Sequence, residues 1–235
     1  MIARRSLPIL AKLAAAAAVL FASTIVLRAC GLTSRVQNYR VTAIVEVDGK
    51  EVRASGVQQL RERKAMPFAG GLDGDSVEVF GEAVPVNLGS RGRFYIIMVD
   101  GTRDPVTHEV LLRGAPQMLA ELHLTGGGAH PRRWFGAWSI PKEHMPAMVD
   151  FANPADPMSV RLVDPAHLEE TFGPGVNLKD LVVEPTIHPI TRGIDGLLPW
   201  VNSCGQYVHL NCESISYGPR SVLYRTLYMH DFKRD

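Results

Sequence analysis

Two cysteines and a histidine lie close together near the C-terminus, in the arrangement Cys204-x4-His209-x2-Cys212. These residue types could form a disulfide, hold a metal ion or supply a reactive thiol. A structural zinc site needs four ligands at set spacings, and this segment offers three candidates whose spacing matches no such site. Two cysteines separated by seven residues can close a small loop in an oxidising compartment. The sequence therefore predicts a disulfide between Cys204 and Cys212, with unbonded thiols and a metal or catalytic site as the alternatives.

Histidines and carboxylates elsewhere in the chain form no complete catalytic set. His123 and His130 flank a triple glycine and His144 follows, but their spacing matches neither ligands one helical turn apart nor an H-E-x-x-H motif. Asp73-Gly74-Asp75 alternates carboxylates as calcium loops do, yet it lacks the other oxygen ligands and the closing Glu. The chain contains no Gly-x-Ser-x-Gly elbow and no phosphate-binding loop. We therefore assign no catalytic, cofactor-binding or metal-binding residue.

The best candidate for an interaction surface is the segment 132–138, which contains Arg132, Arg133, Trp134 and Trp138. Indole rings favour the headgroup zone of a bilayer, and guanidinium groups pair with anionic groups. Such a segment suits a bilayer surface or an anionic glycan. The alternative is that the tryptophans belong to the core and the arginines lie in a solvated loop.

The first 30 residues read as an export signal. Arg4 and Arg5 precede a segment from Leu7 to Leu27 that only Lys12 interrupts, and a basic start followed by an apolar centre is what a translocon recognises. The apolar stretch is close to the ~20 residues that a helix needs to span a bilayer, so it can serve as an uncleaved anchor.

A second reading of the same segment is lipidation. Leu27-Arg28-Ala29-Cys30 resembles a bacterial lipobox in which Cys30 carries the lipid, although Arg28 departs from that pattern. Plain cleavage is the third possibility. In all three cases residues 35–235 lie outside the cytoplasmic membrane.

Charge separates the N-terminal segment from the rest of the chain. Residues 1–28 contain four of the 25 basic residues and no acid, which leaves 21 basic against 24 acidic residues and a formal charge of −3. A protein that binds nucleic acid needs a clustered basic surface. We therefore expect no nucleic-acid partner. The expected partners are the membrane, through the N-terminal segment, and another envelope protein.

Alternating β-branched residues predict a hairpin directly after the N-terminal segment. Residues 39–47 and 51–60 read as strands, and Asp48-Gly49 between them suits a two-residue turn in which both positions have positive φ. A second pair of strands spans 76–88 and 93–99, joined by a turn at 89–92. The stretch 94–99 is continuously apolar, as expected of a strand that is buried on both faces.

The rest of the chain predicts short elements. Asp164 and Pro165 open a helix that Gly173 ends. The other expected elements are a helix at 116–124, strands at 159–163, 178–184 and 222–229, and a helical turn at 194–201. The predicted fold is α+β and β-dominated, with antiparallel hairpins and a few short helices after one N-terminal hydrophobic helix. The predicted organisation is a signal or anchor at 1–30, a linker at 31–37 and a single exported domain at 38–235.

Several segments resemble a group of uncharacterised proteobacterial envelope proteins. They are FANPADP at 151–157 with the residues up to 160, VDP at 163–165, FGPGV at 172–176, TRGI at 191–194 and LPW at 198–200. The first hairpin and GEAV at 81–84 are similar too, so the resemblance covers most of residues 40–201. It implies a bacterial source and an anchored exported domain. It implies no activity, which leaves a non-enzymatic binding or structural protein as the favoured reading and an exported hydrolase, using Asp and His on cell-wall or lipid material, as the alternative.

Overall fold

The structure is a computed structural model that describes residues 35–63, 76–101, 136–205 and 227–235, together with eight single residues: Val19, Val110, Leu112, Pro116, Leu119, His209, Leu210 and Cys212. The chain divides into two compact units, one of Val36–Arg61 with Val77–Asp235 and the other of Met1–Arg35 with Glu62–Ser76. The predicted N-terminal helix, apart from Val19, lies outside the described residues. Among the residues that are described, no helix is long and apolar enough to cross a bilayer.

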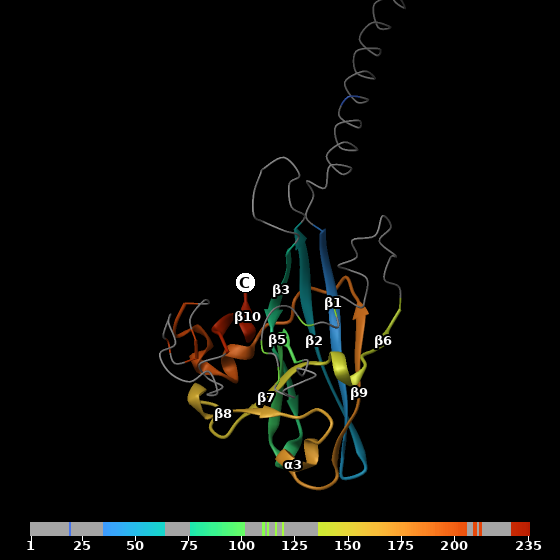
Figure 1. Cartoon of the computed structure of the whole chain (residues 1–235), viewed down its shortest axis with the longest axis vertical. Coiled ribbons are helices and arrows are strands. Elements are labelled where there is room, and N and C mark those ends of the chain that lie inside the picture. The colour runs from blue at the N-terminus through green and yellow to red at the C-terminus, as the bar shows by residue number, and fades with distance from the viewer. Residues whose placement is uncertain are drawn as a thin grey trace, which may run out of the picture. The chain divides into compact units, whose positions relative to one another are not determined.

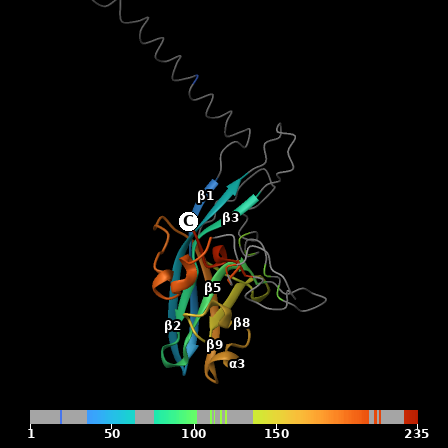
Figure 2. The ribbon, with the colours of Figure 1, turned by 90° about the vertical axis from the view of Figure 1, so that its left-hand side faces the viewer.

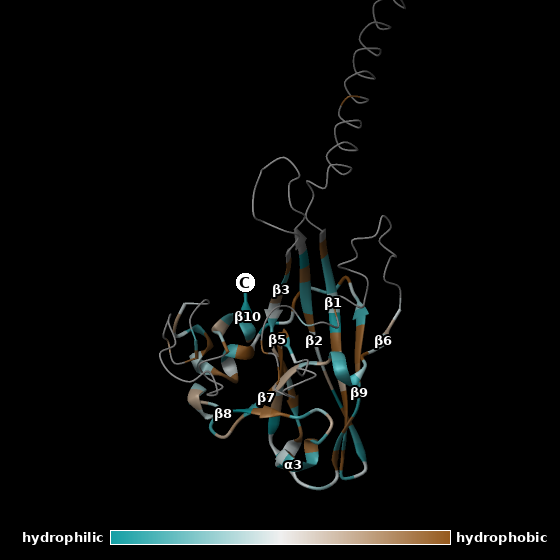
Figure 3. Cartoon of the chain, in the orientation of Figure 1, coloured by the Kyte–Doolittle hydropathy of each residue, from teal (hydrophilic) through white to brown (hydrophobic). Residues whose placement is uncertain are grey.

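The larger sheet of the main unit has six strands in the order β10-β3-β2-β1-β9-β6 (Figure 1). Its members are β1 (Arg35–Val47), β2 (Lys50–Arg63), β3 (Ser76–Glu82), β6 (Trp138–Ser139), β9 (Val176–Pro185) and β10 (Lys233–Arg234). Alternate residues of β1 point into the core, because side chains alternate between the two faces of a strand. Val41, Ala43 and Val45 are fully buried, and Figure 3 shows the alternation as teal and brown bands along the long strands.

The predicted hairpin is confirmed at residue level. Asp48 has φ 51° and Gly49 has φ 77°, so both central residues of the turn lie in the left-handed region that the Asp-Gly pair predicts. The turn is further held by the Asp48 N–H, which donates to the Gly175 carbonyl at 2.9 Å, and by a 2.8 Å ion pair between Asp48 and Arg91.

The smaller sheet has four antiparallel strands in the order β4-β5-β7-β8. These are β4 (Val84–Asn87), β5 (Arg93–Asp100), β7 (Pro146–Phe151) and β8 (Val160–Val163). The predicted strand at 76–88 supplies β3 to one sheet and β4 to the other, with Ala83 at the crossing. There the Ala83 N–H donates to the Phe232 carbonyl at 2.7 Å. Figure 2, turned by 90°, shows the two sheets side on.

β5 lies between two hydrophobic cores, as its continuous apolar sequence predicts. Phe94, Ile96 and Met98 pack between the sheets with residues of β1 and β9. The alternate residues Tyr95, Ile97 and Val99 belong to a second core on the other face of the strand. That second core is closed by three short 3-10 helices, η4 (Ile194–Gly196), η5 (Pro199–Asn202) and η7 (Met229–Asp231).

The helix α3 (Leu168–Phe172) begins later than the sequence predicts. Asp164 accepts a hydrogen bond from the Ala166 N–H at 2.9 Å, so it caps an isolated turn and the helix starts after His167. Gly173 ends the helix with φ 89°, as predicted. The described residues also form the 3-10 helices η1 (Gly89–Arg91), η2 (Lys142–His144) and η3 (Pro157–Ser159).

The predicted closing strand at 222–229 is wrong in its described part. Tyr228 forms one isolated bridge with His209, and Met229 already belongs to η7. The cause is local, because the Asp231 carboxylate accepts from the Tyr228 N–H at 2.8 Å and turns the chain into a helical turn. Residues 222–226, and most of the helix expected at 116–124, lie outside the described residues.

Candidate functional site

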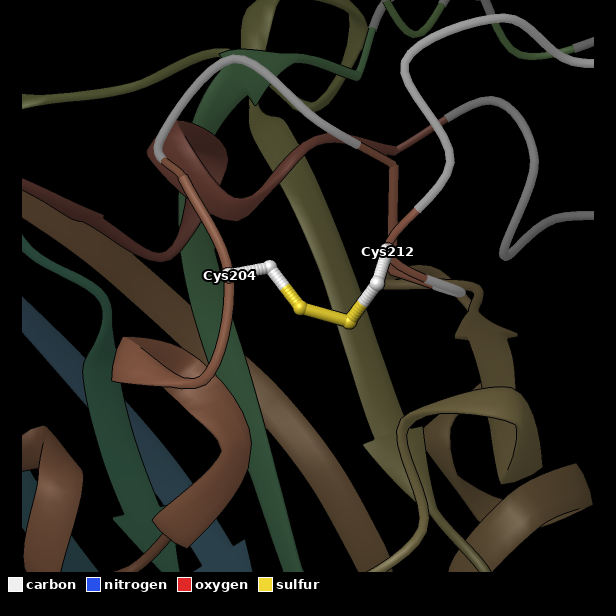
Figure 4. Close-up of a disulfide and its surroundings, with 2 residues drawn as sticks. All are labelled: Cys204 and Cys212. Carbon is white, nitrogen blue, oxygen red and sulfur yellow. A yellow bond between two sulfur atoms is a disulfide. The ribbon is translucent and has the colours of Figure 1, made fainter.

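The predicted disulfide between Cys204 and Cys212 is present (Figure 4). Their Cα atoms are 5.7 Å apart, within the ~7 Å that a disulfide allows. Cys204 packs against the second core just after η5. No group of three His, Cys, Asp or Glu side chains gathers as a metal site within the described part of the chain.

His209, which the sequence offers as a third ligand beside the cysteines, is instead a buried packing residue. Its side chain is 6% exposed, and its ring lies 4.2 Å from the Tyr228 ring, which in turn stacks 5.2 Å from His230. The His209 carbonyl accepts from the Cys212 N–H at 2.9 Å, so the disulfide loop fixes the position of this histidine. Its Nδ1 atom is buried and has no hydrogen-bond partner among the described residues.

Asp231 lies next to this stack of rings, and the pKa of its carboxyl group is shifted from its ordinary value. Burial raises its pKa to about 6, although the charge of His230 and the hydrogen bond from the Tyr228 N–H act in the opposite direction. The His230 Nε2 atom lies 3.5 Å from the Asp231 carboxylate.

Glu82 is a second buried carboxylate, placed where β3 passes into β4. One carboxylate oxygen accepts from the Ile194 N–H at 2.8 Å, and the other lies 3.8 Å from both Arg192 and Lys233. It lines a cavity of about 290 Å³ whose walls include Thr191. No local signal in the sequence predicts this contact, although Glu82 belongs to the GEAV segment and Ile194 to the TRGI segment.

A larger cavity of about 380 Å³ lies beside β7 and β8 and is mostly apolar, with Lys142, Glu143 and Asp164 in its wall. His144, one of the three histidines considered for chemistry, follows Glu143 in η2. His123 and His130 lie outside the described residues.

Trp138 lies at the margin of the six-stranded sheet. It belongs to β6, the last strand in the sheet order, and pairs with Val183 of β9. The residue is 51% exposed, so it is not a core tryptophan. Its neighbour Ser139 donates a hydrogen bond to Asp180 of β9, which fixes the short strand in place.

The remaining predicted site residues, Cys30, Arg132, Arg133 and Trp134, lie outside the described residues. The lipidation site and most of the basic-aromatic surface therefore stay predictions. So does the resemblance to the proteobacterial envelope proteins. In comparisons with known proteins, no family model, no curated protein and no solved structure matches this chain.

Proposed function

We propose that this protein is a membrane-tethered component of a bacterial cell envelope, with residues 35–235 outside the cytoplasm. The observation that carries the proposal is the bond between Cys204 and Cys212, because structural disulfides form and persist in oxidising compartments. The basic and apolar start of the chain supports the same location, since it has the two parts of an export signal.

Within that location, we propose that the domain is a non-enzymatic binding module. Its binding surface is the sheet margin at Trp138, where a large aromatic side chain stands half exposed on a strand of two residues. Tryptophan is enriched among the residues that dominate binding energy at protein interfaces. A sheet edge also offers backbone groups to an added strand, so the expected partner is another envelope protein.

Location is tested with a reporter fused after Asp235 that is active only after export. We expect activity, and an equivalent cytoplasmic reporter should stay silent. The opposite pattern would refute the proposed location.

Binding is tested by placing a photo-crosslinking amino acid at Trp138 and, as the control, at Met158. The two positions are matched in exposure, because Trp138 is 51% and Met158 is 54% exposed. They differ in location, since Trp138 belongs to β6 of the larger sheet and Met158 belongs to η3, next to β8 of the smaller sheet. We expect a discrete adduct with one envelope protein from position 138 and none from position 158. No adduct at 138, or the same adducts at both positions, would contradict the proposed surface.

A further inference from the structure

One end of the six-stranded sheet joins the start of β1 to the chain that follows β9. The two strands are antiparallel, with Tyr39 opposite Pro185, so the residues after Pro185 return to the place where β1 begins. The Thr186 N–H donates to the Asn38 carbonyl at 3.0 Å. The Asn38 side chain donates to the His188 carbonyl at 2.9 Å. Thr186 and His188, on the two sides of Ile187, are therefore both held against β1.

Ile187, the residue between these two fixed positions, is 99% exposed. The His188 N–H donates to the Thr186 hydroxyl at 3.2 Å, which closes a tight turn and leaves the isoleucine pointing away from the protein. Val36, two residues before Asn38 on β1, is 53% exposed. A single exposed apolar side chain is ordinary. Two at one end of one sheet, one of them held in a rigid turn, need a more specific explanation.

The covalent chain supplies that explanation, because it limits how far this end can be from the membrane. The uncharged run that ends at Leu27 lies eight peptide steps before Arg35, where β1 begins. A chain spans at most ~3.5 Å per residue, so the start of β1 stays within about 28 Å of the last apolar residue. A lipid on Cys30 would shorten that limit to about 18 Å. The turn at Asp48-Gly49 is at the other end of a 13-residue strand, about 40 Å away at ~3.3 Å per residue.

The polar groups around Ile187 also suit a headgroup layer. A shallow hollow of about 460 Å³ beside it is lined by Gln37, Thr186 and His188 and by Arg40, whose guanidinium pairs with the Glu184 carboxylate at 2.7 Å. Amide, hydroxyl and imidazole groups can hydrogen-bond to lipid phosphates and glycerol esters, while branched apolar side chains enter the acyl boundary. The combination of one protruding apolar residue and a polar surround is that of a surface resting on a bilayer.

We propose that this end of the sheet contacts the membrane to which the protein is tethered, with Ile187 and Val36 inserted into the lipid headgroup region. The inference rests on the proposed tether and deepens it. It fixes which face of the domain is turned to lipid, and it turns the Asp48-Gly49 end of β1 toward the periplasm.

The test uses the full chain in vesicles of phosphatidylethanolamine and phosphatidylglycerol that contain lipids brominated along the acyl chain. An environment-sensitive fluorescent amino acid is placed at Ile187 and, as the control, at Lys50, which is exposed at the hairpin end of the sheet. Substitution at either position disturbs no buried contact. Because interfacial side chains sit ~5–10 Å into the headgroup and acyl boundary, we expect bromine to quench the label at 187 by about half and to leave the label at 50 unchanged.

Flotation of the same samples separates the two proposals. Protein that fails to float with the vesicles overturns the tether itself. Protein that floats while the label at 187 is unquenched, or is quenched no more than the label at 50, overturns the contact and keeps the tether. A label at 187 that is shielded from water only after envelope proteins are added would assign this surface to a protein partner and also overturn the proposal.

Discussion

Replacing Asp231 with Asn should remove one pH-dependent contribution to the stability of the second core. Burial raises the pKa of Asp231 from 3.8 to about 6 in the folded chain. The folded state therefore binds a proton at this site more tightly than the unfolded state does, and the contribution to the free energy of unfolding is complete below pH 3.8. It is lost as the pH rises through about 6.

The size of this effect follows from the raised pKa. At 1.36 kcal/mol for each tenfold change in proton affinity, the full contribution is about 3 kcal/mol, of which about 2 kcal/mol is lost between pH 4 and pH 7. Asn keeps a carbonyl oxygen that can accept from the Tyr228 N–H, as the Asp231 carboxylate does at 2.8 Å. The Asp231→Asn variant should therefore fold, and its stability relative to the natural chain should increase with pH over this window.

The assay is urea unfolding of the full chain in detergent at several pH values between 3.5 and 7.5, without reductant. The quantity to compare is the difference in free energy of unfolding between variant and natural chain, because other carboxylates cancel in that difference. Asp195→Asn, at a carboxylate that is 51% exposed, serves as the control for the change from carboxylate to amide. A difference for Asp231→Asn that changes with pH no more than that of the control would refute the argument from burial.

Three further predictions concern single features of the chain. Replacing Cys204 and Cys212 together with Ser should lower the free energy of unfolding by ~2–3 kcal/mol, and adding reductant to the natural chain should give the same loss; no difference in urea unfolding would show that the bond does not constrain the chain. Gly101→Ala should lower the free energy of unfolding by ~1–3 kcal/mol, because the added Cβ would lie 2.5 Å from the backbone nitrogen of Ala147 in β7. Gly196→Ala is the control, since no atom lies within 4 Å of the added Cβ there, and it should lower the free energy of unfolding far less. If Cys30 is the lipid attachment site, Cys30→Ser should abolish labelling by a fatty-acid probe, and a natural chain that takes up no probe would leave the helical anchor as the tether.

Features that depend on a few adjacent residues could be predicted from the sequence. The Asp48-Gly49 turn needs positive φ at two neighbouring positions, and few residue pairs other than this one suit it. The burial of β5 on both faces follows from six apolar residues in a row. The disulfide belongs to the same class, because two cysteines separated by seven residues need little help from the rest of the fold to meet.

Features that depend on distant residues could not be predicted. Glu82 meets Ile194 across 112 residues, and nothing near either residue signals the other. The passage of one extended segment from the large sheet into the small one is set by how both sheets pack at Ala83. The half exposure of Trp138 also depends on its place at the sheet margin, which its own sequence does not reveal. The start of α3 shows a different kind of error. Asp164 has a good local capping signal, but it stabilises an isolated turn, and the helix begins only at Leu168.

The segments GEAV at 81–84, TRGI at 191–194, FANPADP at 151–157 and LPW at 198–200 are joined in pairs in the structure, and these contacts explain their residue types. GEAV contacts TRGI through the hydrogen bond between Glu82 and the Ile194 N–H. FANPADP contacts LPW through the Trp200 indole, which donates to the Pro154 carbonyl at 2.9 Å.

Each of these contacts satisfies a buried or partly buried polar group inside the fold, and the Thr191 hydroxyl does the same by accepting from the Val57 N–H at 2.9 Å. Such groups are costly to leave without a partner, so the stability of this fold alone accounts for these residue types at these positions. The segments therefore have structural tasks in this chain, and their residue types carry no argument for a reaction. A function is better sought outside them, at the disulfide loop around His209, or where apolar side chains face solvent, at Trp138 and Ile187.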